Sequence, residues 1–285
     1  MFQPSLLEKE ISVNNKKIVS VNLTTYNRAL ILSKCLESII NQTYRDIEII
    51  IIDDCSSDNT TEIVKKYQVK DNRIKYFRHS TNFGNAQARN TALENCKGFY
   101  VAFIDDDDEW IDKDKIKKQV EIFENSDDQK LGIVCSGIIR SKGNGEKKVE
   151  IAKVPKDIKY QVLKGGFIHN STVLTKKNIL EEVGGFDLNV CRGVDSEFFR
   201  RMIVLYGYNV IFMEAITTQY NEDSDNRMTS IVNCDGYLKH ITSQLFNIKK
   251  YLKYLIKKPS TLFIRIMIII KLFFRYLKCK ITYEK

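Results

Sequence analysis

Four consecutive aspartates, Asp105 to Asp108, follow a short apolar run and are the residues best suited to chemistry in this sequence. Carboxylates this close repel one another, so a cation should neutralise them. A group of carboxylates without histidine or cysteine suits Mg²⁺ or Mn²⁺, which leave coordination positions open for phosphate oxygens. The same residues could instead form a solvated acidic turn before the next helix. The sequence by itself is compatible with both interpretations.

Three further residues could serve such a site. Asp54 ends another apolar run and could accept a hydrogen bond from a base or ribose, or belong to a helix-capping turn. Arg89 could reach a diphosphate with its fork of donors, or be an ordinary surface arginine. Asp195 could act as a general base if it points into a cleft, or be only the first-turn acid of its helix. A shared location in the fold would favour the functional roles.

The apolar runs before these clusters are short and rich in β-branched or aromatic residues, which predicts strands. Helical patterns lie between them, and this alternation predicts a mainly parallel sheet with helices on both faces. Parallel strands end at one edge of a sheet, and open α/β sheets bind ligands outside that edge. We therefore expect the polar clusters to meet in one cleft. The predicted strands are 18–23, 47–52, 74–77 and 99–104, and the predicted helices are 29–40, 59–69 and 85–96.

The pattern changes after Trp110, and a second half follows without any internal repeat. A Gly-rich turn at 142–145 predicts a hairpin between two strands. The expected helices here are 113–125, 177–183 and 195–206, and the expected strands are 131–140, 147–154 and 171–175.

The composition of the 285 residues is that of a globular protein, with 43% hydrophobic residues and 3 prolines, which excludes a disordered or collagen-like chain. The net charge of +9 is concentrated in residues 249–285, which carry eleven Lys or Arg and one Glu. The body is therefore nearly neutral, and we expect no nucleic-acid partner. Seven widely spaced cysteines without a C-x-x-C pair predict reduced thiols in a cytosolic protein, and the N-terminal segment lacks the apolar core of a signal peptide.

Several short motifs occur in a defined order over about residues 17–225. They are Thr24-Thr25-Tyr26-Asn27-Arg28, Gln42-Thr43-Tyr44, Asp53-Asp54-Cys55-Ser56-Ser57-Asp58-Asn59-Thr60, Asn82-Phe83-Gly84 with Ala88-Arg89-Asn90, Asp105 to Trp110, Gly184-Gly185-Phe186-Asp187 and Val194-Asp195. Together they resemble the family 2 inverting glycosyltransferases of GT-A fold. The resemblance implies an α/β glycosyltransferase domain over 1–225. Its nucleotide-sugar-binding half, 17–110, would be Rossmann-like with a mainly parallel central sheet, and its acceptor half would be 111–225.

The resemblance also implies a nucleotide-sugar donor, most often a UDP-sugar. By position, Thr24 and Tyr26 would line the base and ribose pocket, Asp54 would accept a hydrogen bond from the uracil ring, and Arg89 would lie near the base or diphosphate.

Asp105-Asp106-Asp107 resembles the D-x-D element of the family. This implies that Asp105 and Asp106 bind the nucleotide sugar, with Asp106 near the ribose, and that Asp107 is the principal ligand of Mn²⁺ or Mg²⁺. Asp195 matches the position of the catalytic base, which would accept the proton of the acceptor hydroxyl while the anomeric carbon inverts. Trp110, Gly185 and Phe186 would lie on the acceptor side.

Three positions depart from the family pattern: Thr24 replaces the usual Pro, Cys55 the usual Gly, and Val194 the Glu that commonly precedes the base. The Gln-x-x-Arg-Trp signature and the membrane spans of processive members are not found. The resemblance therefore implies transfer of a single sugar.

The C-terminal region 226–285 is expected to be helical, basic and amphipathic. Its longest apolar run, 262–274, contains Arg265 and Lys271 and is too short and too charged to span a bilayer. Lys271, Arg275 and Lys278 share one helix face, which indicates an interfacial helix on an anionic cytoplasmic leaflet, or alternatively a helix docked on the protein or a second subunit. A cytoplasmic enzyme held peripherally at the inner membrane face suggests a lipid-linked saccharide acceptor in surface polysaccharide, O-antigen, capsule or lipooligosaccharide synthesis.

Two other functions compete with this interpretation. A sugar nucleotidyltransferase would need a Gly-rich, basic loop after the first strand to hold a triphosphate, and residues 24–28 contain no glycine. A non-enzymatic nucleotide-binding protein of the membrane surface is the second alternative.

Overall fold

The computed structural model describes residues 17–142, 145–151, 155–221 and 234–283. The first half of the chain forms four parallel strands in the order β3-β2-β1-β4, as the alternating pattern predicted. They are β1 (Val19–Thr25), β2 (Ile47–Asp53), β3 (Ile74–Arg78) and β4 (Tyr100–Asp105). The C-terminal ends of β1, β2 and β4 bring Thr25, Asp53 and Asp105 to one edge of the sheet.

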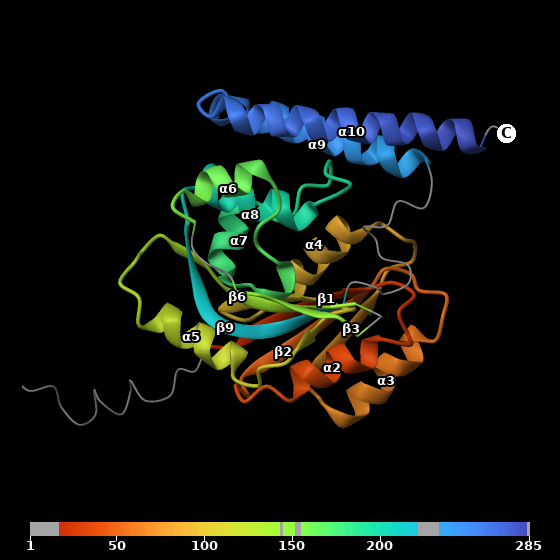
Figure 1. Cartoon of the computed structure of the whole chain (residues 1–285). Helices are drawn as coiled ribbons and strands as arrows, with labels where there is room; N and C mark the ends of the chain where they lie inside the picture. Colours follow the sequence, from red (N-terminus) through yellow and green to blue (C-terminus); the bar gives the residue numbers. More distant parts are fainter. Residues whose placement is uncertain (1–16, 143–144, 152–154, 222–233, 284–285) are drawn as a thin grey trace, which may run out of the picture.

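The second half extends the same sheet beyond β4. The short β8 (Leu174–Lys176) pairs antiparallel with β4 and β6, and β6 (Leu131–Ser141) pairs parallel with β9 (Asn209–Asn221). Two short strands complete it: β5 (Glu109–Trp110) on β9 and β7 (Lys147–Glu150) on β6. Figure 1 shows the sheet curling along β9. The mixed α/β architecture with a mainly parallel central sheet confirms the predicted fold class.

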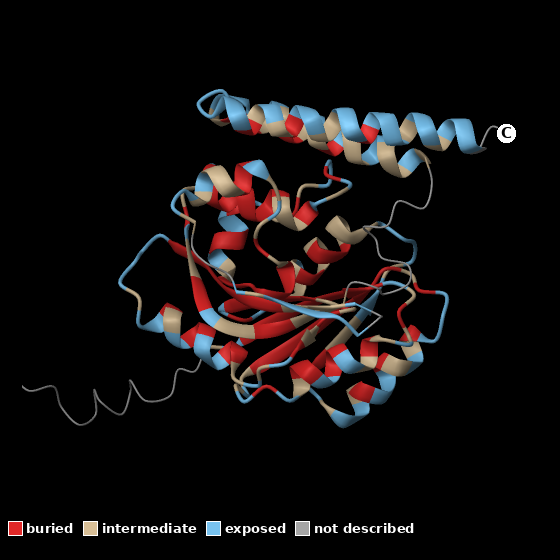
Figure 2. Cartoon of the chain, viewed as in Figure 1, coloured by how far each residue is buried: buried red, intermediate tan, exposed pale blue. Residues whose placement is uncertain are grey.

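Helices cover both faces of the sheet (Figure 1). One face carries α2 (Leu32–Ile40), α3 (Thr60–Lys70) and α5 (Lys115–Glu124). The other carries α4 (Asn85–Asn95), α6 (Ile158–Lys164), α7 (Lys177–Val183) and α8 (Val194–Val204). Alternate residues of β2 enter two separate cores: Ile50 and Ile52 pack under α4 and α8, and Ile49 and Ile51 under α2. This two-sided burial explains the apolar run 49–52 of β2. Its neighbour β1 is buried along its whole length, whereas the edge strand β3 is buried only at Ile74 (Figure 2).

Several elements of the second half differ from the prediction. The strand expected at 171–175 is a 3₁₀ turn, η1 (Asn170–Thr172), followed by β8. The strand expected at 147–154 ends at Glu150, and 152–154 lie outside the described residues. Neither β9 nor α6 was predicted. The buried residues of these two elements are not regularly spaced along the sequence, because neighbouring elements cover them unevenly.

The C-terminal region forms a helical hairpin of α9 (Cys234–Leu255) and α10 (Pro259–Tyr283). It lies across α6 and α8, on the side away from the sheet (Figure 1). Residues 226–233 of the predicted helical region lie outside the described residues. Within the described part of the chain, no helix is long and apolar enough to cross a bilayer.

The expectation that all seven thiols are reduced is wrong for one pair. Cys234 and Cys279 form a disulfide that joins the start of α9 to the end of α10, with their Cα atoms 5.7 Å apart. The antiparallel hairpin brings together two residues 45 positions apart, which cysteine spacing alone does not reveal. The other five cysteines are free thiols.

Candidate active site at the C-terminal edge of the sheet

The loops after β1 and β2 are tied together by hydrogen bonds. The Asn27 amide donates to Ser56 Oγ at 2.9 Å, and the Ser57 amide donates to Asn27 Oδ1 at 2.7 Å. Asn27 and Cys55 both have left-handed backbone, with φ of 53° and 70°. Such a conformation favours glycine or asparagine, which accounts for the glycine usual at the position of Cys55. Tyr26, predicted to line the base pocket, is exposed beside these loops.

Asp54, predicted to bind the uracil ring, is buried and organises the loop that leads into α4. Its carboxylate accepts hydrogen bonds from the Phe83 amide (2.9 Å), the Gly84 amide (2.7 Å) and His79 Nδ1 (2.7 Å). Thr24 is also nearly buried, and its hydroxyl donates to Asn85 Oδ1 at the start of α4, at 3.2 Å. The two residues therefore connect the β1 and β2 ends to the helix that carries Arg89. Contact with a base stays a prediction for both.

Arg89 lies against the first aspartate of the acidic cluster. Its Nη2 donates to Asp105 Oδ1 at 2.6 Å, and Asn170 Nδ2 donates to the same oxygen at 2.8 Å. The Arg89 side chain is 5% exposed, whereas 33% of the Asp105 side chain is exposed. The fold thus brings Arg89 from α4 and Asp105 from β4 to one point, as the common strand edge predicted.

Arg28 is a second buried arginine at the cluster, and it was not among the predicted site residues. Its Nε lies 3.8 Å from Asp106 Oδ1, and its Nη2 lies 3.8 Å from Asp107 Oδ2. Burial and the charge of Asp107 raise the pKa of Asp106 to about 7, and the positive charge of Arg28 opposes this rise. Its position just after β1, at the same edge as the aspartates, was the signal that could have identified it.

The aspartate loop is also fixed from the second half of the chain. Ser171 Oγ donates to Asp108 Oδ2 at 2.5 Å, and Asn221 Nδ2 donates to the Asp107 carbonyl at 2.8 Å. These contacts come from η1 and the end of β9, so they depend on strand pairings that the sequence did not predict. They leave Asp107 at the wall of a cavity of about 290 Å³ that Lys34 also lines.

The donor set fits a hard cation held by few protein ligands. Among the residues that the structure describes, no group of three or more His, Cys, Asp or Glu side chains is arranged to enclose a metal ion. Asp106 nevertheless has a buried carboxylate oxygen, Oδ2, without a hydrogen-bond partner in that part of the chain. Mg²⁺ and Mn²⁺ commonly bind one or two carboxylates and complete their shell with water and phosphate oxygens. Asp107, whose side chain is 15% exposed, and the free oxygen of Asp106 match that requirement.

Asp195 stands in the first turn of α8, after Gly193, whose φ of 67° is left-handed. It is half-buried, and His169 lies close enough to experience the charges of both Asp195 and Asp105. Two residues further along α8, the buried Glu197 accepts from Lys250 Nζ at 2.8 Å and from the Tyr251 hydroxyl at 2.9 Å. Asp195 therefore lies near His169, on a helix that α9 supports.

The three residues predicted on the acceptor side are packed behind the cleft. Trp110 is 3% exposed and Phe186 is 2% exposed. Trp110 Nε1 donates to the Ser171 carbonyl at 2.7 Å. A Cβ atom at Gly185 would lie 2.7 Å from Asn90 Oδ1, so this glycine allows a close approach to α4. Trp110 and Phe186 support the cleft from inside the protein, whereas Gly185 is half-buried, and contact of the three with an acceptor stays a prediction.

Comparison with known proteins agrees with this geometry. The family model described as Glycosyl transferase family 2 matches residues 20–184. An uncharacterized glycosyltransferase of Methanocaldococcus jannaschii is 31% identical over 233 residues, which are 81% of this chain and 76% of the relative. A protein of Escherichia coli, UDP-Glc:alpha-D-GlcNAc-diphosphoundecaprenol beta-1,3-glucosyltransferase WfaP, is 42% identical over 108 residues, 38% of this chain and 42% of its own length.

The fold is also found in a solved structure. The mannosyltransferase PcManGT from Pyrobaculum calidifontis, in complex with GDP-Man and Mn²⁺, superimposes with a TM-score of 0.61 at 22% identity. The superposition covers 84% of this chain and 65% of the mannosyltransferase.

Proposed function

This chain belongs to glycosyltransferase family 2, and from that premise we propose that it is a metal-dependent, inverting enzyme that transfers one sugar from a nucleotide sugar to a hydroxyl group. The observation that carries the proposal is the convergence of Asp105, Asp106 and Asp107 with two buried arginines at the edge of the sheet. Clustered carboxylates and arginines suit a nucleoside diphosphate together with a cation. We take a UDP-sugar as the donor, in agreement with the donor that the name of the Escherichia coli relative prints.

In this proposal, Asp107 would hold Mn²⁺ or Mg²⁺, whose charge would stabilise the leaving diphosphate, and Asp105 and Asp106 would contact the nucleotide sugar. Arg89 would bind a phosphate oxygen; its support is that the guanidinium lies at the same edge, where it donates to Asp105. Tyr26 and Thr24 would border the nucleoside. Asp195 would accept the proton of the acceptor hydroxyl as that oxygen attacks the anomeric carbon from the side opposite the diphosphate. An α-linked donor would then give a β-linked product.

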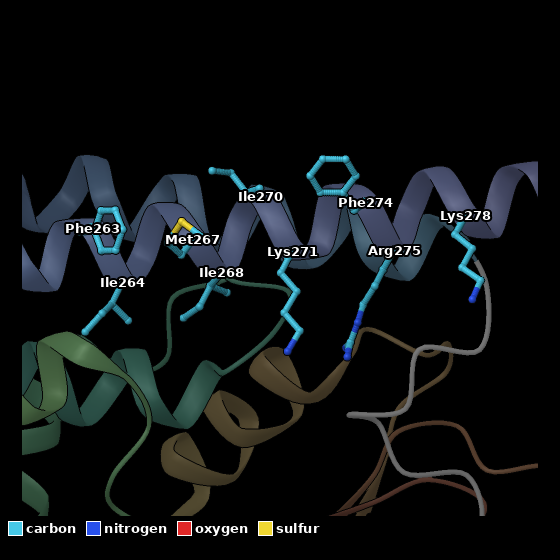
Figure 3. A pocket seen from close by; sticks show the side chains of 9 residues that line it. All are labelled: Phe263, Ile264, Met267, Ile268, Ile270, Lys271, Phe274, Arg275 and Lys278. Atoms are coloured by element: carbon cyan, nitrogen blue, oxygen red, sulfur yellow. The ribbon is translucent and has the colours of Figure 1, made fainter.

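We place the acceptor on a lipid carrier. The Escherichia coli relative is named for a lipid-linked saccharide acceptor, and the α9–α10 hairpin offers a surface that suits a membrane. Phe263 and Phe274 are 64% and 66% exposed. Figure 3 shows that Ile270 and Phe274 point away from the catalytic domain, whereas Lys271 and Arg275 point toward it. Apolar side chains would enter the interface, and exposed lysines such as Lys253 and Lys257 would meet anionic headgroups.

The proposal is tested by the release of nucleoside diphosphate from a panel of nucleotide sugars, with Mn²⁺ and with lipid-linked saccharides. The natural protein should release nucleoside diphosphate, and the Asp195→Asn variant should bind the donor with similar affinity while its turnover falls about 10²-fold or more. Formation of a nucleoside triphosphate and a sugar 1-phosphate from a nucleotide sugar and added pyrophosphate would instead identify a nucleotidyltransferase. Absence of any release across the panel would contradict catalysis.

A further inference from the structure

We propose that a separate cavity in the acceptor half binds one sugar ring of the acceptor, an inference that rests on the proposed transferase function. The cavity has a volume of about 230 Å³ and lies between β6, β7 and residues 166–172. Clefts for drug-sized ligands start near 300 Å³, so this cavity has the size for a single ring and not for a whole nucleotide.

The lining of the cavity suits a pyranose. Its inner wall is apolar and includes Ile138, Phe167 and Phe212, and its opening carries Arg140 and His169. A pyranose ring has apolar C–H faces and a rim of hydroxyl groups. The apolar wall can cover a ring face while the polar side chains exchange hydrogen bonds with the hydroxyls.

The polar side chains at the opening hold one another in place. Arg140 Nε donates to Glu150 Oε1 at 2.8 Å, and the His169 ring nitrogen Nε2 lies 3.5 Å from Arg140 Nη2. The Arg140 guanidinium also lies 4.9 Å from the ring centroid of Tyr220. About a quarter of the Arg140 side chain and a third of those of Glu150 and His169 are exposed. The cluster is thus preorganised and still accessible to a ligand, which lowers the entropy cost of binding.

The walls of the cavity belong to segments that contact neighbours of the proposed site. Gly166 lines the cavity, and a Cβ atom there would lie 2.7 Å from Ser196 Oγ, in the residue next to Asp195. Asn170, which follows the lining residue His169, donates to Asp105 at 2.8 Å. The segment 166–170 therefore connects the cavity both to the helix of the proposed base and to the acidic cluster.

The protonation of His169 is compatible with this role. Burial and the charge of Arg140 lower the pKa of the imidazole below its usual value. The ring is then neutral at physiological pH, with one nitrogen that donates and one that accepts, which matches a sugar hydroxyl.

The test uses the full-length protein with Mg²⁺ and UDP, and methyl glycosides of glucose, galactose and N-acetylglucosamine as probes. Saturation-transfer NMR measures glycoside binding to the natural protein and to the variants Arg140→Met and His169→Ala. Both variants should bind the preferred glycoside about tenfold more weakly, because each removes a polar contact to the hydroxyl groups of the sugar ring. The matched control is Lys148→Met. Lys148 Nζ lies 3.6 Å from Glu150 Oε1, but the side chain is 78% exposed and does not line the cavity.

Unchanged binding in both variants, or an equal loss in Lys148→Met, would overturn the inference. So would the absence of glycoside binding to the natural protein. Hydrolysis of the nucleotide sugar without acceptor gives a separate readout for the proposed function. If hydrolysis is present in all variants while glycoside binding is insensitive to Arg140 and His169, only the sugar subsite is wrong. If nucleoside diphosphate is released from no donor, either without an acceptor or with the lipid-linked saccharides, the transferase proposal itself fails.

Discussion

At the scale of single residues, the acidic cluster is balanced by arginines that come from different elements. Arg28 faces Asp106 and Asp107, and Arg89 binds Asp105. Burial, and after it the charge of Asp107, raises the pKa of Asp106 to about 7, and the charge of Arg28 opposes this rise. Asp107 has the more accessible carboxylate of the two that face Arg28, with 15% of its side chain exposed against 6% for Asp106.

Asp107→Asn should therefore reduce metal-dependent transfer by about 10²-fold or more, because a neutral amide binds a divalent cation poorly and the diphosphate loses its counter-charge. Nucleoside diphosphate release measured across a Mn²⁺ titration checks this expectation. Asp127→Asn is the matched control, since Asp127 is exposed in the loop before β6. Metal-dependent turnover at the natural level in Asp107→Asn would show that another residue holds the cation.

Lys115 is an unusual residue in the core beneath the site. It is fully buried, donates to Gln119 Oε1 at 2.7 Å, and lies 4.3 Å from the centroid of the Trp110 ring. Burial lowers its pKa from 10.5 to about 7. Between these two values the unfolded chain binds more protons than the folded protein, so the contribution of Lys115 to stability rises with pH over this range.

The free energy of unfolding of the natural protein should therefore increase from pH 7 to pH 9.5, relative to that of Lys115→Met. Methionine has a similar volume and no charge, and replacing a buried charge in this way is often neutral or stabilising by about 1–4 kcal/mol near neutral pH. Urea unfolding at the two pH values, with the exposed Lys113→Met as control, measures the difference. A difference independent of pH would contradict a lowered pKa for Lys115.

At the scale of elements, α9 holds the helix that carries the proposed base. Arg200 of α8 donates to Asn247 Oδ1 at 2.6 Å, and Lys250 Nζ bridges Glu197 and Asp187 at 2.8 and 2.7 Å. Ser243 Oγ accepts from the Cys191 amide at 3.1 Å. The polar contacts fix both the loop before α8 and its first turns, so the position of Asp195 depends on the C-terminal hairpin.

Lys250→Met should lower kcat more than it changes the KM for the donor, because it leaves the buried Glu197 with fewer partners and loosens the first turns of α8. We expect a loss of stability of about 1–3 kcal/mol in addition. Lys249→Met is the control at the exposed neighbouring position. Steady-state kinetics with both substrates varied separate the two parameters. A rise in the KM for the donor, with kcat unchanged, would contradict a positioning role for Lys250.

At the scale of the whole molecule, the hairpin presents an apolar outer surface on a domain whose charge is otherwise nearly neutral. Large exposed side chains are concentrated on α10, and a disulfide closes the open end of the hairpin. Exposed apolar surface of this extent is unusual for a face in water and marks an interaction site. In the arrangement of Figure 3 this outer surface is free of the catalytic domain.

Replacing Phe263 and Phe274 by Ser should reduce co-sedimentation with anionic vesicles about tenfold or more, because two aromatic rings no longer enter the interface. Val69→Ser is the control, since Val69 is 90% exposed on α3, on the opposite side of the domain. Unchanged sedimentation of the double variant would contradict membrane contact through α10. If the natural protein forms a dimer and the double variant does not, the partner of this surface is instead a second copy of the chain.

The sequence determined the first half of the fold and the place of the acidic cluster. Each strand from β1 to β4 is a local apolar run that is followed by a polar loop, and strand and helix alternate at short range. Such patterns depend on neighbours along the chain, so periodicity identifies them. The common edge of parallel strands then predicted that the residues after β1, β2 and β4, among them Asp54 and Asp105, lie along one edge of the sheet.

Only the tertiary structure decided how the cluster is completed. The pairing of Arg28 with Asp106 and Asp107, the contact of Asn221 with the aspartate loop and the disulfide between Cys234 and Cys279 all join distant segments. Such contacts depend on how β9 and the hairpin pack, because packing of whole elements sets which side chains meet and residue spacing does not encode it. For the same reason, only the structure showed that Trp110 lies in the core.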